Sequence, residues 1–166
     1  LISSTLVVVR KAILHILSIE YIGHFSLCMI AFFFSFWLIL AHYDQLAEEI
    51  LFQTDGRVDA VVVGVGTGGT IGGIARKIKE KSPNTLVVGA DPIGSILAIP
   101  SELNVEGPPY KVEGTGYDFI PRTCLRTCVD KWVKTEDVST FKHSRDLIRK
   151  EGLLVGGSSG SVVYAA

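Results

Sequence analysis

Residues 58–81, VDAVVVGVGTGGTIGGIARKIKEK, join three patterns that together predict how the chain folds. The first part is a continuous β-branched run without polar alternation, which predicts a strand buried on both faces. A loop of glycine and threonine follows, and apolar residues then recur at helical spacing to about Lys81. α/β proteins hold phosphates with this order of elements, because backbone N–H groups and the positive end of the helix dipole point at the anion.

The centre of this loop is the predicted phosphate cradle, made of Gly66, Thr67, Gly68, Gly69 and Thr70. Its two threonines would add hydroxyl donors to the backbone amides. The spacing Gly64-x-Gly66-x-x-Gly69 also satisfies the dinucleotide fingerprint, with Asp91 about 20 residues further on as the candidate ribose-binding carboxylate. A tight strand-to-helix turn that binds nothing is a third interpretation of the same glycines.

Composition limits the class of protein. The chain has 166 residues, enough for one domain with a core, and its formal net charge is −1 without a basic run, so nucleic acid is not an expected partner. Cys28, Cys124 and Cys128 form neither a disulfide framework nor zinc-type pairs. Reduced thiols in an intracellular protein and no metal site are therefore expected.

Residues 1–40 differ from the rest of the chain. No Asp, Glu, Lys or Arg occurs between Glu20 and Asp44, and an uncharged stretch of this length is a candidate transmembrane helix at about 20–40. A membrane contact is expected only through residues 21–40. The alternative is that residues 1–40 are of uncertain origin and do not belong to the native coding sequence. From Ala41 onward the composition is that of an ordinary α/β protein.

The pattern after Ala41 predicts an open parallel sheet with flanking helices. A strand, a helix and a second strand within about 35 residues form a βαβ unit, and ligands bind beyond the carboxyl ends of such strands. A second small-residue loop, at 156–161, is a further candidate to face the same ligand. The other expected elements are a helix at 42–53, a strand at 85–91, a surface segment at 104–121, a strand at 129–133 with Trp132 in the core, a helix at 137–150 that ends at Gly152, and a helix that begins in the loop at 156–161.

Five blocks in this order carry a resemblance to a known family: VGTGGTIGGIARKIKEK, GADPIGSILA, VEGTGYDFIP, VDKW and EGLLVGGSSGS. They resemble the cystathionine β-synthase family of fold-type II pyridoxal-phosphate-dependent enzymes, over residues 41–166 and none of residues 1–40. The resemblance implies a partial catalytic domain of the tryptophan synthase β-like fold, preceded here by an apolar helix. It also makes the dinucleotide interpretation of the glycine loop a minor one.

The resemblance implies roles for particular residues. The cradle residues Gly66 to Thr70 match the family's loop around the cofactor phosphate, and Ser158 matches the serine at the pyridine nitrogen. Gly114, Gly116 and Tyr117 match the loop on the substrate side. Ile93 stands where the family's Asp-Pro-Glu-Gly-Ser segment has glutamate, so no role is transferred to it.

No residue of this chain matches the family's Schiff-base lysine, so no catalytic residue is assigned. The haem-binding region and the regulatory domain also have no counterpart. The reaction implied by the resemblance is that of a lyase in transsulfuration and cysteine biosynthesis, which condenses serine with homocysteine to cystathionine. This chain alone is expected to be inactive, and the intact protein is expected to be a cytoplasmic homo-oligomer that acts on amino acids.

Two alternatives remain at this stage. One is a membrane-anchored, non-catalytic relative that binds a phosphate compound or pairs with an intact subunit. The other is an O-acetylserine sulfhydrylase, also called cysteine synthase.

Overall fold

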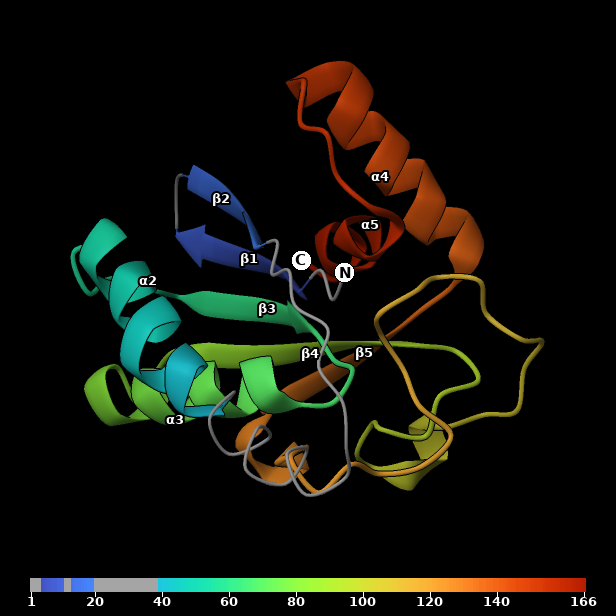
Figure 1. Cartoon of the computed structure of the whole chain (residues 1–166), viewed down its shortest axis with the longest axis horizontal. Helices are drawn as coiled ribbons and strands as arrows, with labels where there is room; N and C mark the ends of the chain where they lie inside the picture. Colours follow the sequence, from blue (N-terminus) through green and yellow to red (C-terminus); the bar gives the residue numbers. More distant parts are fainter. Residues whose placement is uncertain (1–3, 11–12, 20–38) are drawn as a thin grey trace, which may run out of the picture.

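The computed structural model describes residues 4–10, 13–19 and 39–166, which form a five-stranded sheet with helices on both faces (Figure 1). The strand order is β2-β1-β3-β4-β5, and the strands β3, β4 and β5 are parallel. The strands are β1 (Ser4–Arg10), β2 (Ile13–Ile19), β3 (Ala60–Gly64), β4 (Leu86–Pro92) and β5 (Lys131–Thr135). The helices are α2 (Ala47–Gln53), α3 (Gly69–Lys81), α4 (Asp137–Glu151) and α5 (Gly157–Ala165), with the shorter η1 (His42–Leu46), η2 (Ser101–Leu103) and η3 (Arg126–Cys128).

The predicted βαβ unit is confirmed. β3 and β4 pair in parallel with Val62 opposite Val88, and α3 connects them. Val61 and Val63 pack with α3 in the larger core, whereas Val62 packs in the smaller core with Val162 of α5. The strand is apolar at consecutive positions because both of its faces are covered.

Trp132 of β5 is buried in the larger core, as the sequence predicts. A Cβ atom on Gly89 of β4 would lie 3.0 Å from the Trp132 ring. The glycine in the middle of this strand thus makes room for the indole, which explains a residue type that ordinarily weakens strands.

Two helices differ in detail from the sequence prediction. The helix expected at 42–53 is present within an unbroken helical run that begins at residue 39, and it contains a π-helical turn, η1, before α2. The loop expected at 156–161 is for the most part the first half of α5. Its small residues are explained by packing, because a Cβ atom on Gly160 would lie only 1.9 Å from the carbonyl oxygen of Thr140 in α4.

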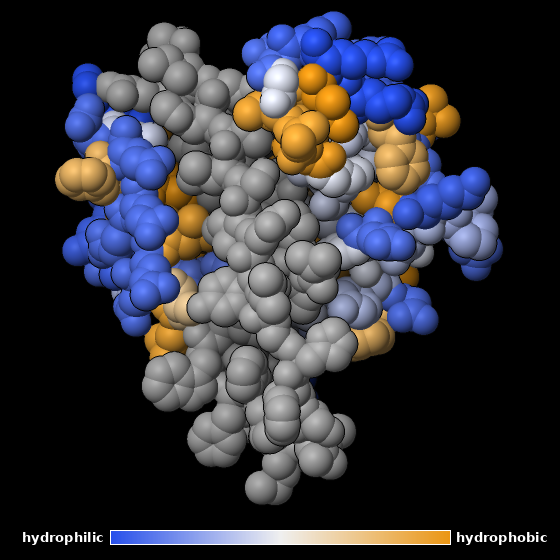
Figure 2. Space-filling model, turned by 45° about the horizontal axis from the view of Figure 1, so that its top comes forward, coloured by the Kyte–Doolittle hydropathy of each residue, from blue (hydrophilic) through white to orange (hydrophobic). Residues whose placement is uncertain are grey.

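The outer surfaces of the helices carry polar residues. Figure 2 shows mostly hydrophilic side chains at the left and at the upper right, where α2 and α4 lie, with an apolar patch beside the latter. On α4, Asp146 pairs with Lys142 at 3.3 Å and with Lys150 at 3.5 Å. Such exposed pairs contribute little stability each, but they keep this face of the helix in water.

The N-terminal segment contains an element that the sequence analysis did not predict. β1 and β2 form an antiparallel hairpin, and β1 extends the sheet by pairing antiparallel with β3, with Val7 opposite Val62. The apolar helix predicted at about 20–40 lies outside the described residues except for residues 39 and 40. Within the described ranges, no helix is both long and apolar enough to cross a membrane.

Candidate functional site

The cradle residues lie where the carboxyl end of β3 meets the first turn of α3. Gly68 has a φ angle of 84°, and a Cβ atom there would lie 2.3 Å from the Cα atom of Cys124. Only glycine fits this position, because the backbone is left-handed and a neighbouring chain segment touches it. The turn directs the N–H groups of the first helical turn, which have no partner within α3, towards the loop.

A cavity of about 90 Å³ opens at this loop, larger than the roughly 15 Å³ that a single water needs. It is lined by Gly64, Gly66, Thr67, Gly68, Thr70, Ile71, Gly114 and Tyr117. The predicted phosphate cradle and the predicted substrate-side loop therefore meet at one cavity, although Gly66 and Tyr117 are far apart in the sequence.

Backbone contacts hold the two loops together. A Cβ atom on Gly66 would lie 2.7 Å from the carbonyl oxygen of Gly114, so the loops touch through their main chains. The Gly116 N–H donates to the carbonyl oxygen of Val65 at 2.8 Å. Gly116 has a φ angle of 80° and packs on Pro92, which excludes a side chain there.

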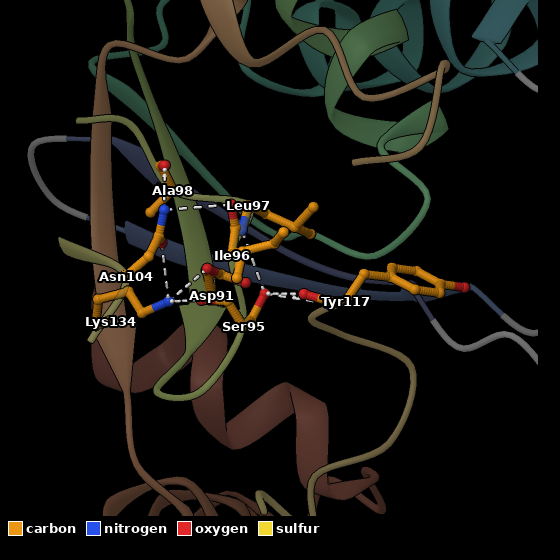
Figure 3. A network of polar contacts seen from close by, with 8 residues as sticks. All are labelled: Asp91, Ser95, Ile96, Leu97, Ala98, Asn104, Tyr117 and Lys134. Atoms are coloured by element: carbon orange, nitrogen blue, oxygen red, sulfur yellow. Dashed lines mark hydrogen bonds and ion pairs between the residues drawn. The ribbon is translucent and has the colours of Figure 1, made fainter. Parts of the chain in front are cut away.

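Ser95 fixes the backbone of Tyr117, and the tyrosine ring extends away from this contact (Figure 3). The Ser95 hydroxyl donates to the Tyr117 carbonyl oxygen at 3.2 Å and accepts from the Tyr117 N–H at 3.0 Å. The Ile96 N–H donates to the same carbonyl at 3.0 Å. Tyr117 is thus held at its main chain, which leaves its ring to line the cavity and to contact Phe119 edge-on at 4.9 Å.

A buried ion pair supports the segment that carries Ser95. Lys134 Nζ lies 2.7 Å from a carboxylate oxygen of Asp91 and donates to the Ser95 carbonyl oxygen at 2.8 Å (Figure 3). The Asp91 side chain is fully buried, and burial raises its pKa while the Lys134 ammonium opposes that shift. A carboxylate in this position does not line the cavity, which speaks against the ribose-binding role that the dinucleotide interpretation gave it.

Thr67 and Thr70 are the predicted hydroxyl donors of the cradle, and both line the cavity. Thr67 is exposed, and its carbonyl oxygen accepts a hydrogen bond from the Thr123 hydroxyl. Thr70 Oγ1 lies 3.1 Å from Nε2 of His42, at the start of η1. His42 was not among the predicted site residues, because no local pattern connects residues that are 28 positions apart.

Three of the predicted site residues do not line this cavity. Gly69 is buried in the first turn of α3, and Gly116 lies behind the substrate-side loop. Ser158 is buried in the first turn of α5. The first small-residue loop lines this cavity, and the expectation that both small-residue loops face one ligand stays a prediction.

Two of the three cysteines lie in the part of the chain that the structure describes. Cys124 and Cys128 are free thiols, and burial raises the pKa of Cys124 to about 11. Cys28 lies outside the described residues. Among residues 4–10, 13–19 and 39–166, no group of His, Cys, Asp and Glu side chains has the arrangement of a metal site.

The chain is similar to known enzymes over most of its length. A family model described as "Pyridoxal-phosphate dependent enzyme" matches residues 27–166, so the similarity begins upstream of Ala41, earlier than the sequence analysis expected. "Cystathionine beta-synthase" of Dictyostelium discoideum is 58% identical over 127 residues, which are 76% of this chain and 26% of that protein. "Cystathionine beta-synthase" of Mus musculus is 59% identical over 128 residues, 76% of this chain and 23% of that protein.

A more distant relative carries a different name. "Cysteine synthase" of Helicobacter pylori is 38% identical over 126 residues, 76% of this chain and 40% of that protein. The chain spans about a quarter of the length of the two cystathionine beta-synthases. The family model, which covers most of the chain, shows that this chain belongs to the pyridoxal-phosphate dependent enzyme family.

Proposed function

We propose that the chain is a segment of a cystathionine β-synthase, and that the cavity between the cradle and residues 114–117 binds the phosphate of pyridoxal phosphate. The whole enzyme would condense serine with homocysteine to cystathionine, as a lyase of transsulfuration and cysteine biosynthesis. The identity of 58–59% with two proteins of that name supports the proposal over the 38% identity with a cysteine synthase.

The residues present fit a phosphate group, and the observation that carries the proposal is the meeting of two loops at one cavity. Its walls include three glycines of the β3–α3 connection and two threonines, so backbone amides and hydroxyls can approach an anion closely. No carboxylate is among the lining residues, and the N-terminal end of α3 supplies a favourable dipole.

Each part of the site would have a separate task. Pyridoxal phosphate, when bound, supplies the electron-withdrawing ring that the chemistry of amino acids at the α-carbon requires. The cradle would hold its phosphate, and Tyr117 would wall the cavity from the substrate side. For Ser158 we propose a hydrogen bond to the pyridine nitrogen, a role that rests on the family resemblance.

The chain alone is expected not to turn over serine and homocysteine. The residues that line the described cavity include no lysine, and Lys134 is paired with buried Asp91. In the part of the chain that the structure describes, no amine lines this cavity to hold the cofactor covalently or to move a substrate proton. Cystathionine formation by the purified chain would contradict this expectation.

Binding of the cofactor tests the proposal, with a matched pair of glycine variants. Gly68→Ala places a methyl group against Cys124 at a left-handed position, so binding of pyridoxal phosphate should fall at least tenfold. Gly152→Ala also changes a left-handed glycine, but nothing lies within 4 Å of the added atom. Titration of cofactor absorbance should show near-native binding for Gly152→Ala, and equal binding by both variants would contradict the assignment.

Cysteine synthase is the second candidate, since one relative carries that name. The two candidates differ in substrates, so the complete enzyme should form cystathionine from serine and homocysteine faster than cysteine from O-acetylserine and sulfide. The opposite ranking would favour the second candidate. Homo-oligomer formation and a cytoplasmic location remain predictions.

A further inference from the structure

We propose that His42 is a positioning residue of the phosphate cradle, which orients the Thr70 hydroxyl so that its hydrogen points to a phosphate oxygen. This inference rests on the proposed function, because it concerns the same cavity. Thr70 lines that cavity from the first turn of α3, and His42 Nε2 lies 3.1 Å from its hydroxyl oxygen.

A close contact between η1 and α3 holds His42 beside Thr70. A Cβ atom on Gly73 of α3 would lie 2.8 Å from His42 Cβ, 2.9 Å from the Tyr43 nitrogen and 2.5 Å from the Ile39 carbonyl oxygen. The backbone of η1 therefore rests directly on α3, one helical turn beyond Thr70. The π-helical turn at His42–Leu46 marks the same point of the chain, and such turns are frequent at functional sites.

The proposed role of His42 follows from the direction of its hydrogen bond with the Thr70 hydroxyl. A threonine hydroxyl has one hydrogen to donate, and the unprotonated oxygens of a phosphate group accept hydrogen bonds. If His42 carries its hydrogen on Nε2, the ring donates to Thr70 Oγ1 and the Thr70 hydrogen is directed to the anion. If the hydrogen is on Nδ1, Nε2 accepts the Thr70 hydrogen instead, and a hydroxyl lone pair faces the anion. A bound phosphate thus selects the Nε2–H form.

His42 is half-buried, and burial lowers its pKa below the ordinary 6.5. The ring is therefore neutral near pH 7 and carries a single hydrogen, whose position is what the anion selects. The charged side chains on η1, α2 and α3 are Asp44, Glu48, Glu49, Arg76, Lys77, Lys79, Glu80 and Lys81. Burial, and not one of these charges, is the cause of the pKa shift of His42.

The segment that carries His42 is fastened independently of its ring. Lys77 of α3 pairs with Glu48 of α2 at 2.9 Å and lies 4.0 Å from the centre of the Tyr43 ring. The Tyr43 hydroxyl also donates to Glu80. Replacement of the imidazole should therefore leave η1 in place against α3, which makes substitution a fair test.

The first test measures the protonation state of the His42 ring in the 166-residue chain. Nitrogen NMR of the imidazoles should show the His42 Nε2 atom protonated once inorganic phosphate is bound. His143 is the internal control, because its Nδ1 lies 2.7 Å from the Ser139 carbonyl oxygen and its ring contacts Tyr164. His143 should not respond to phosphate. A His42 ring that keeps an unprotonated Nε2 with phosphate bound would overturn the inference.

The second test uses variants of His42 to separate the effect of its hydrogen-bond donor from the effect of its ring shape. Glutamine can donate from an amide at a similar reach, so His42→Gln should bind inorganic phosphate within about twofold of the native chain. Phenylalanine cannot donate, and His42→Phe should bind about fivefold to tenfold more weakly. His143→Phe should bind as the native chain does. Equal losses in both His42 variants, or none in either, would overturn the positioning role.

The outcome also distinguishes this inference from the proposed function. If the native chain binds neither pyridoxal phosphate nor inorganic phosphate, the proposed function fails, and the role of His42 with it. If the native chain binds both while His42→Phe binds equally well, the cradle stands and the role of His42 is refuted. If His42→Phe does not fold, the NMR measurement on the native chain decides the question.

Discussion

Two glycine-rich segments of this chain look alike in sequence and lie in different surroundings. The cradle segment (residues 64–70) lies between β3 and α3 and lines a cavity, with a left-handed glycine at Gly68. The packed segment (residues 156–161) also follows an apolar run and opens a helix, but its Gly160 touches the backbone of α4. Small residues leave space in both cases, and the neighbouring elements decide whether a ligand or a helix fills it.

The two segments also differ in what holds them. The packed segment is tied directly to α4, with Ser161 Oγ 3.1 Å from Thr140 Oγ1 and Ser144 Oγ 3.0 Å from the Gly156 carbonyl oxygen. The far wall of the cradle's cavity is held indirectly, through Ser95 and Lys134. Substitutions at these positions should therefore separate a site that depends on remote support from one that depends on local packing.

The largest loss of stability is expected for Lys134→Met, which leaves Asp91 buried without its partner. The cost should be about 3–5 kcal/mol in the free energy of unfolding, measured by urea denaturation near pH 7. Burial already raises the folded-state pKa of Asp91 above its ordinary 3.8, so its contribution to folding is most favourable below that pH and declines as pH rises.

In Lys134→Met, the contribution of Asp91 to the free energy of unfolding should decline more steeply with pH, because no ammonium group stabilises the buried carboxylate. The difference in stability between native protein and Lys134→Met should be small near pH 3 and should grow as pH rises above 4. Asp91→Asn in the same chain should recover much of the loss. A difference that stays constant with pH would show that Lys134 acts through packing alone.

Gly160→Ala should come next, at about 3 kcal/mol, because the added methyl group meets the Thr140 carbonyl oxygen at 1.9 Å. Gly156→Ala is the matched control, since nothing lies within 4 Å of its added atom. Urea denaturation measures both. Molecules of Gly160→Ala that remain folded should bind inorganic phosphate as the native chain does, and weakened binding would break the distinction between the two segments.

Ser95→Ala should cost about 1–2 kcal/mol, because it leaves the part-buried N–H of Tyr117 without its hydroxyl partner. The effect on the cavity should be a looser Tyr117, visible as faster hydrogen exchange of the Tyr117 and Ile96 amides. Exchange rates equal to those of the native chain would show that Gly116 and Val65 alone hold this loop.

Thr67→Ala should change stability least, by less than about 0.5 kcal/mol, since the side chain is exposed. Its carbonyl contact with Thr123 involves the main chain and would survive the change. Phosphate affinity, measured by calorimetry, should nevertheless fall a few-fold because one cradle hydroxyl is lost. A large stability loss without an effect on binding would assign Thr67 to the fold instead of the site.

The elements that the sequence predicted well are those whose pattern is local. β3, β4 and α3 follow from a buried apolar run, a glycine turn and helical spacing, and the end of α4 follows from Gly152. The start of α5 was also predicted, within residues 156–161, but the contact of its small residues with α4 was not, because that contact joins distant parts of the sequence. The hairpin of β1 and β2 was missed for a similar reason, since its pairing with β3 is a long-range property.

The candidate site was likewise predicted where its residues form local motifs. The cradle and the loop at 114–117 are recognisable motifs, and the structure places both at one cavity. His42 and Lys134 act through contacts 28 and 43 positions away in sequence, so no local pattern indicates them. The role of Ser158 remains a prediction.

The most direct test of the central claim is a crystal structure of the chain with pyridoxal phosphate bound. The account predicts that the phosphate lies in the cavity at the first turn of α3, within hydrogen-bond distance of the amides of residues 66–70 and of the Thr70 hydroxyl. A cofactor phosphate bound elsewhere on the chain, with this cavity left to solvent, would contradict it.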